Sequence, residues 1–397
     1  MAENVMTKDV GPDKKLRSMN DPKFRGQLFQ IAVLICLVAA AYWIVSNTIA
    51  NLQRANIASG FGFLEGRAGF DISQALIPFS SDSTYGRALL VGFLNTLLVA
   101  VTGIVAATIL GFLIGIGRLS NNWLIAKLCT VYVEVFRNIP PLLIVFFWYV
   151  GVISILPQIR QSIELPFSVF INNRGISFPK PDFGGAGVWV FTAFIIAILA
   201  SIAIGFYSRN KQAATGKRLP VLWITVALLI ALPTLTMLVA GGALSFELPE
   251  LGRFRLQGGM TVGPEFLSLF LSLSFYTAAY IAEIVRSGIV GVNKGQTEAA
   301  HALGLSPSLT TRLVVIPQAM RIIIPPLTSQ YLNLMKDSSL AIAVGYADIV
   351  SIGGTIMNQT GQAIEVITIW AIVFVSLSLT ASAFMNWFNT KVALKER

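Results

Sequence analysis

Ionisable side chains stand at three places inside long apolar stretches of this 397-residue sequence. They form two Glu-x-x-Arg pairs and one polar triplet: Glu134 and Arg137, Glu283 and Arg286, and Lys336, Asp337 and Ser338. Such residues are costly inside a membrane, so they usually face the interior of a helix bundle and mark a pathway or a paired structural site. If these stretches are membrane helices, the three places are candidates for contact with a solute.

The two Glu–Arg pairs can also have a structural role in place of contact with a solute. Residues three apart lie on one face of a helix, so each Glu–Arg pair can neutralise itself and brace the bundle, and we expect this role for both pairs. Lys336 is the stronger candidate for solute contact, because the adjacent Asp337 points to another side of the helix. Asn95 and Thr96 could hydrogen-bond a solute or, as is more common, a neighbouring helix.

The composition supports a membrane setting. Hydrophobic residues make up 55% of the chain and charged residues 12%, whereas soluble proteins carry about a quarter charged residues. The net charge of +10 is better explained by basic cytoplasmic loops than by nucleic-acid binding. Cys36 and Cys129 lie in apolar runs and are expected to be small buried side chains.

The residue types exclude several kinds of chemistry. His301 is the single histidine, which argues against a histidine-based metal site or catalytic dyad. The spacing GxxxxGK[ST] of a nucleotide-binding phosphate loop is absent, so the chain does not hydrolyse ATP by that route. We therefore expect neither a catalytic site nor a cofactor in this chain.

Eight apolar runs are long enough to cross a bilayer. They cover approximately residues 28–50, 88–116, 123–150, 186–207, 219–241, 264–289, 320–344 and 364–388. Basic residues in 1–26, 209–218 and 391–397 place both termini in the cytoplasm by the positive-inside rule. Residues 151–185 are expected to be a loop with short amphipathic pieces, and within 151–263 one span could instead be re-entrant.

Proline pairs interrupt two of these runs. Pro140–Pro141 interrupts the third run, and Pro325–Pro326 is expected to break the seventh at its start. Such interruptions are tolerated where the backbone is buried in protein or lines a cavity. The second run instead carries small residues at spacings that favour close helix packing: Gly92, Gly103, Ala106, Ala107, Gly111, Gly115 and Gly117.

A weakly hydrophobic segment, residues 295–317, separates the sixth and seventh runs and is called the helical knob below. Thr297 is expected to cap a first short helix, with Glu298 in its first turn, and Gly304 to close it in a left-handed turn. Ser306 followed by Pro307 is typical of the start of a second helix. Because helices this short are unstable alone, the knob is expected to dock against a partner.

The knob resembles the cytoplasmic EAA loop of permease subunits of ATP-binding-cassette (ABC) importers. The matching residues are Glu298, Ala299, Ala300, Gly304, Val314, Ile316 and Pro317. In that family the loop inserts into a cleft on the ATPase subunit, so the resemblance implies an ATPase-coupling role for Glu298, Ala299, Ala300, Gly304 and Pro317. The alternative is an ordinary surface helical hairpin.

Two longer blocks resemble the polar-amino-acid branch of these permeases. Residues 87–150 contain GFLNTLL and YVEVFRNIPPLL; residues 264–390 contain YIAEIVRSGI, IPQAMRIIIPPL and LMKDSSL. The resemblance implies an all-α, type I ABC importer permease fold. Compact members have five spans, so the segment 27–86, with a first helix and a periplasmic part, and the insertion 151–263 are additions. This longer layout is similar to permeases of general L-amino-acid transporters, which work as heterodimers.

The resemblance also implies a function and partners. The chain would carry L-amino acids from the periplasm across the bacterial inner membrane, with a periplasmic binding protein, a second permease and an ATPase dimer that binds ATP and Mg. Membrane lipid would surround it, and nucleic acid would play no part. A zwitterionic cargo needs donors for its carboxylate and acceptors for its ammonium, and the candidate pathway residues are Lys336, Asp337, Ser338, Asn95, Thr96, Glu134, Arg137, Tyr280 and Glu283.

Two other functions fit a polytopic chain. An ion-coupled secondary transporter working alone would use the polar residues as proton or sodium sites, but the two halves show no clear inverted repeat and the knob would be idle. A membrane scaffold would have no need of kinked, polar spans.

Overall fold

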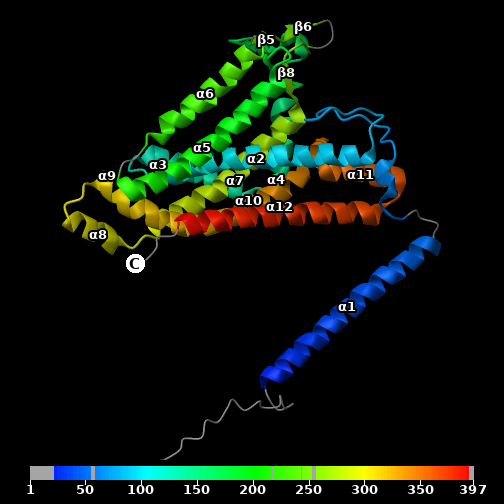
Figure 1. Cartoon of the computed structure of the whole chain (residues 1–397), viewed down its shortest axis with the longest axis horizontal. Helices are drawn as coiled ribbons and strands as arrows, with labels where there is room; N and C mark the ends of the chain where they lie inside the picture. Colours follow the sequence, from blue (N-terminus) through cyan, green and yellow to red (C-terminus); the bar gives the residue numbers. More distant parts are fainter. Residues whose placement is uncertain (1–21, 55–58, 217–218, 243, 253–255, 393–397) are drawn as a thin grey trace, which may run out of the picture.

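The computed structural model describes residues 22–54, 59–216, 219–242, 244–252 and 256–392, most of them helical (Figure 1). Within these ranges, six helices are long and apolar enough to cross a membrane. They are α1 (Pro22–Arg54), α2 (Tyr85–Gly117), α5 (Gly187–Thr215), α6 (Val221–Val239), α7 (Pro264–Val290) and α12 (Ala363–Val392). Two bent helix pairs raise the number to eight if each pair is one span, as the sequence predicts.

The first bent pair lies where the sequence predicts an interruption. Helix α3 (Trp123–Asn138) ends before Pro140, and α4 (Pro141–Phe146) continues as π-helix through Phe147–Ile153. The two parts meet at an angle of 109°. Proline at the first position of α4 explains the restart, because its missing N–H would be unpaired there in any case.

The second bent pair breaks at a different place from the one predicted. Pro325 and Pro326 lie inside α10 (Ile316–Asp337), which continues through them, so the predicted break at the start of the seventh span is wrong. The chain instead turns after the 3-10 segment Ser338–Val344, where Gly345 has a left-handed φ of 75°. Helix α11 (Ile349–Thr360) follows at a bend of 53°. Membrane helices tolerate internal prolines because neighbouring groups satisfy the freed backbone carbonyls.

Helices α2 and α7 form the centre of the bundle, where the small residues of α2 let the two backbones approach. A Cβ atom on Gly115 would lie 2.7 Å from the carbonyl oxygen of Ala282 and 2.8 Å from Cβ of Val285. Gly92 makes the same kind of contact with α11, because its Cβ would lie 2.9 Å from Cα of Ile349. The predicted close packing of the second span is therefore confirmed.

The contact at Gly92 leads to a stability prediction. Gly92→Ala forces the backbones of α2 and α11 apart and should destabilise the protein by about 1–3 kcal/mol, the usual cost of overpacking. Gly103→Ala is the matched control in the same helix, because its Cβ would meet only the flexible Leu334 side chain, at 3.4 Å. Thermal unfolding in detergent measures both; equal melting temperatures would contradict this account.

The insertion folds into a helical hairpin, α5–α6, and three small antiparallel sheets (Figure 1). The largest sheet has the order β1 (Ile163–Leu165), β2 (Val169–Asn172), β3 (Gly175–Phe178) and β8 (Met260–Val262). The two others pair β4 (Lys180–Asp182) with β5 (Ser245–Glu247), and β6 (Glu250–Leu251) with β7 (Leu256–Gln257). The sequence predicts a loop with short amphipathic pieces in 151–185, whereas the structure has short strands there. One of them, β3, pairs with β8 from the far end of the insertion.

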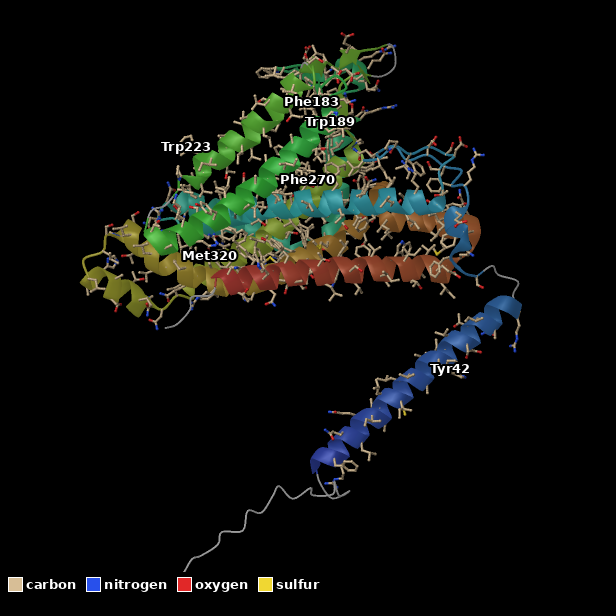
Figure 2. All side chains as sticks on the ribbon, viewed as in Figure 1. Tyr42, Phe183, Trp189, Trp223, Phe270 and Met320 are labelled. Atoms are coloured by element: carbon tan, nitrogen blue, oxygen red, sulfur yellow. The ribbon has the colours of Figure 1, made fainter. Side chains whose placement is uncertain are left out.

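Helix α1 lies apart from the bundle, and most of its side chains are exposed (Figure 2). Tyr42 on this helix is 75% exposed. Cys36 is also exposed and Cys129 is half-buried, so the prediction that both cysteines are buried is wrong. A membrane helix that contacts lipid rather than protein carries its apolar side chains outward, and a cysteine among them does the same.

Candidate functional site

The helical knob, at one end of the bundle, consists of two short helices, the turn between them and a π-helical segment, Thr311–Val315 (Figure 1). Helix α8 (Lys294–Ala302) begins one turn earlier than the sequence predicts: Asn293 Oδ1 accepts from the N–H of Gly295 at 2.8 Å. Asn293, and not Thr297, is therefore the N-cap, and Glu298 lies in the second turn. The local signal for Asn293 is its place just before a helix-forming segment.

The end of α8 follows the prediction. Gly304 has a φ of 78°, and its N–H donates to the carbonyl of His301 at 2.9 Å. The N–H of Leu305 donates to the carbonyl of Ala300 at 3.1 Å, which completes a Schellman motif. Ser306 then caps α9 (Pro307–Thr310), as predicted, by accepting from the N–H of Leu309 at 3.5 Å.

The knob presents an outer surface of mixed character. Glu298 and Ala299 are exposed, whereas Ala300 is buried against the rest of the knob. Leu303 is 83% exposed. Pro317 lies in the first turn of α10, so the knob passes directly into a membrane helix. Apolar side chains exposed on a segment outside the membrane are typical of a surface that binds another protein.

Glu283 is the centre of a charge cluster between α2 and α7. Its carboxylate accepts from Arg286 at 2.6 Å, as the predicted i, i+3 pairing requires. Arg118, at the C-terminal end of α2, donates to the other oxygen, and its side chain is only 10% exposed. Ser287 adds a hydrogen bond at 3.2 Å. Arg118 was not among the predicted site residues, because nothing local to its turn indicates a partner in α7.

Glu134 and Arg137 behave differently. No ion pair joins them in the part of the chain that the structure describes, so the predicted self-neutralisation is wrong for this pair; both side chains are exposed. The guanidinium of Arg137 lies over the ring of Tyr280, 5.4 Å from its centroid. The hydroxyl of Tyr280 lies 3.1 Å from that of Tyr276. The structure thus brings Arg137 and Tyr280 together from α3 and α7.

Asn95 and Thr96 hold the second bent span. The side-chain amide of Asn95 donates to the carbonyl of Ala347 at 2.9 Å, and Thr96 Oγ1 accepts from the N–H of Ile349 at 3.1 Å. Both side chains are buried. They act on a neighbouring helix, the more common of the two expected roles, although Asn95 also lines a cavity of about 260 Å³ together with Tyr346.

Asp348 is a polar residue that the sequence reasoning missed. It is fully buried and caps α11 by accepting from the N–H of Ser351 at 2.8 Å. An aspartate directly before an apolar helical segment is a recognisable N-cap signal.

Lys336, Asp337 and Ser338 lie at the end of α10, where the helix gives way to the 3-10 segment. Lys336 is exposed and Asp337 is half-buried. Ser338 is buried, and its hydroxyl donates to the carbonyl of Met335 at 2.7 Å. No ion pair involves Lys336 among the described residues, so its contact with a solute stays a prediction.

Comparison with known proteins shows which family this chain is similar to. Residues 213–394 match the family described as binding-protein-dependent transport system inner membrane component. The chain is 64% identical to the general L-amino acid transport system permease protein AapQ of Rhizobium johnstonii, over 96% of this chain and 95% of the relative. It is 47% identical to the putative amino-acid ABC transporter permease protein YhdX of Escherichia coli, over 96% and 97%.

A third relative is the glutamate/glutamine/aspartate/asparagine transport system permease protein BztB of Rhodobacter capsulatus, 41% identical over 95% of this chain and 96% of that protein. All three similarities run along nearly the whole chain, so the first helix and the insertion are shared as well as the two core blocks. The chain belongs to the family of permease subunits of amino-acid ABC transporters.

Proposed function

We propose that this permease carries L-amino acids from the periplasm to the cytoplasm and that a separate ATPase drives it through the helical knob. The observation that carries the proposal is the continuity of the knob with two membrane helices. Only residues 291–293 separate α7 from α8, and the knob passes into α10 at its other end. A force on the knob therefore acts directly on helices of the bundle centre.

The contacts within the knob make it a unit that can transmit such a force. Gln318 in α10 donates to Gln296 in α8 at 3.2 Å, and Thr310 and Ala300 are buried inside the knob. The exposed residues Glu298 and Leu303 are then available to the ATPase. Because two packed helices move as one body more readily than an isolated loop, docking at the knob can be converted into helix movement.

The remaining partners follow from the same proposal. A periplasmic binding protein delivers the amino acid, and a second permease completes the pathway. The ATPase dimer binds ATP and Mg, and the whole complex hydrolyses ATP. Both termini and the knob then lie in the cytoplasm, whereas the small sheets of the insertion face the periplasm.

The first test is a gentle detergent purification of the tagged protein, with identification of every stoichiometric chain that accompanies it. An ATPase and a second permease are the expected companions. A solitary protein that transports amino acids in vesicles on an ion gradient alone would instead establish the ion-coupled alternative.

Lys336 provides a prediction about the pathway. Lys336→Ala should lower ATP-driven uptake at least about tenfold, since a hydrogen bond to a charged group contributes roughly 1.5–3 kcal/mol. Assembly with the partners should persist, because Lys336 has no ion pair to lose within the described chain. Lys127→Ala, an exposed lysine of α3, is the control. Unchanged uptake in the Lys336 variant would remove this residue from the pathway.

A further inference from the structure

A groove lies between α5 of the insertion and α12 of the core, near the C-terminal ends of both helices. Its volume is about 270 Å³, and its walls are formed by Ile202, Gly205 and Phe206 from α5 and by Trp387 and Phe388 from α12. Two basic residues, Arg209 and Lys391, complete the lining. Both helices run toward the end of the molecule where α8 and α9 lie (Figure 1).

The walls of the groove are apolar and open to the outside. Phe206 is 48% exposed and Trp387 49%, although both belong to helices that cross the membrane. A Cβ atom on Gly205 would meet no other atom within 4 Å, so the space beside this residue is open. In a bilayer, apolar walls of this kind are covered by acyl chains or by another membrane helix.

The charges distinguish between these occupants. Neither Arg209 nor Lys391 has an acidic partner in the described part of the chain. The ammonium of Lys391 lies 6.0 Å from the centroid of the Trp387 ring, which keeps the charge at the mouth of the groove. Two cations that have no acidic partner among the described residues attract an anionic headgroup, and basic pockets between membrane helices on the cytoplasmic side are typical sites for such lipids.

We propose that this groove binds one anionic glycerophospholipid of the cytoplasmic leaflet. The phosphate lies between Arg209 and Lys391, and an acyl chain follows Phe206 and Ile202 toward the membrane centre. Tryptophan suits the mouth of the site, because its ring is amphipathic and prefers the headgroup level. The lipid fills the space between the insertion and the core and joins the two. The proposal does not depend on which solute is transported.

The experiment purifies the complex in mild detergent and titrates it with phosphatidylglycerol or phosphatidylethanolamine while native mass spectrometry follows the bound lipid. Wild type should bind phosphatidylglycerol in preference to phosphatidylethanolamine. The double variant Arg209→Ala/Lys391→Ala should bind phosphatidylglycerol roughly thirtyfold more weakly, as the removal of two basic side chains predicts. Lys211→Ala is the matched control, because it removes a charge from α5 at a residue that contacts Tyr207 and does not line the groove.

Three results would overturn the proposal. Equal binding of both lipids, or equal weakening in the Lys211 control, would show a general surface attraction and no site. Cross-linking tests whether a protein helix occupies the groove instead. For this experiment Gly205→Cys introduces a cysteine into a protein in which Cys36 and Cys129 are replaced by serine. A link from this position to the second permease in native membranes would show that a protein helix fills the groove. Failed transport with intact lipid binding would count against the proposed function only.

Discussion

Glu298→Lys should abolish ATP-driven amino-acid uptake while the protein still inserts into the membrane. The side chain is exposed on α8 and has no ion pair in the described chain, so the substitution breaks no internal contact. Under the proposed coupling role its effect acts on the docking of the ATPase, because reversal of a charge at an interface costs several kcal/mol. Uptake in vesicles and the amount of ATPase that co-purifies measure the outcome, and both should fall together.

Glu65→Lys is the matched control, since it reverses an exposed carboxylate away from the knob.

Gly304→Pro tests the helical knob through its internal turn. Proline fixes φ near −65° and removes the N–H that donates to His301, whereas Gly304 has a φ of 78°. The knob should lose its turn, and uptake with it. Gly354→Ala, in an open part of α11, should be harmless. Normal uptake in the Glu298 variant would contradict the coupling role.

Glu283→Gln should be among the most destabilising conservative substitutions in the chain. It leaves the shape of the side chain nearly unchanged but removes the charge that neutralises Arg286 and the nearly buried Arg118. Loss of one partner from a buried ion pair typically costs about 3–5 kcal/mol, because the remaining charge stays desolvated. Thermal unfolding in detergent should show a large decrease in melting temperature.

Asp82→Asn provides the contrast. It breaks the pair between Asp82 and Arg67, whose side chains are 77% and 66% exposed, and should cost at most about 1 kcal/mol. The comparison also separates two roles of Glu283. If Glu283→Gln is as stable as Asp82→Asn but fails to transport, the carboxylate contacts the cargo; if it unfolds early, the carboxylate joins α2 to α7.

Local sequence patterns predicted much of the membrane domain. The apolar runs of α2, α7 and α12 predicted spans that agree with the structure within a few residues, because length and composition alone decide whether a helix can cross a bilayer. The turn at Gly304 and the cap at Ser306 were also predictable, since each depends on hydrogen bonds within a few residues. The start of α8 was misplaced because Asn293 and Thr297 are both acceptable caps.

Contacts between distant segments could not be predicted in the same way. Arg118 meets Glu283 only because α2 packs against α7, and no spacing in either helix encodes the partner. The break of the seventh span lies at Gly345 and not at Pro325 because Asn95 and Thr96 bind the backbone of 347–349 and support a new helix start there. Strand β3 pairs with β8 across the whole α5–α6 hairpin.

The sequence by itself therefore determined that the chain crosses the membrane several times, the turn and second cap of the knob, and the membership of the family, because these depend on composition and short-range spacing. The tertiary structure decided which charges are neutralised, where the seventh span bends and where the insertion forms a groove with the core. These features depend on pairs of groups that are brought together only when the helices pack, and the energy of each pair depends on its burial.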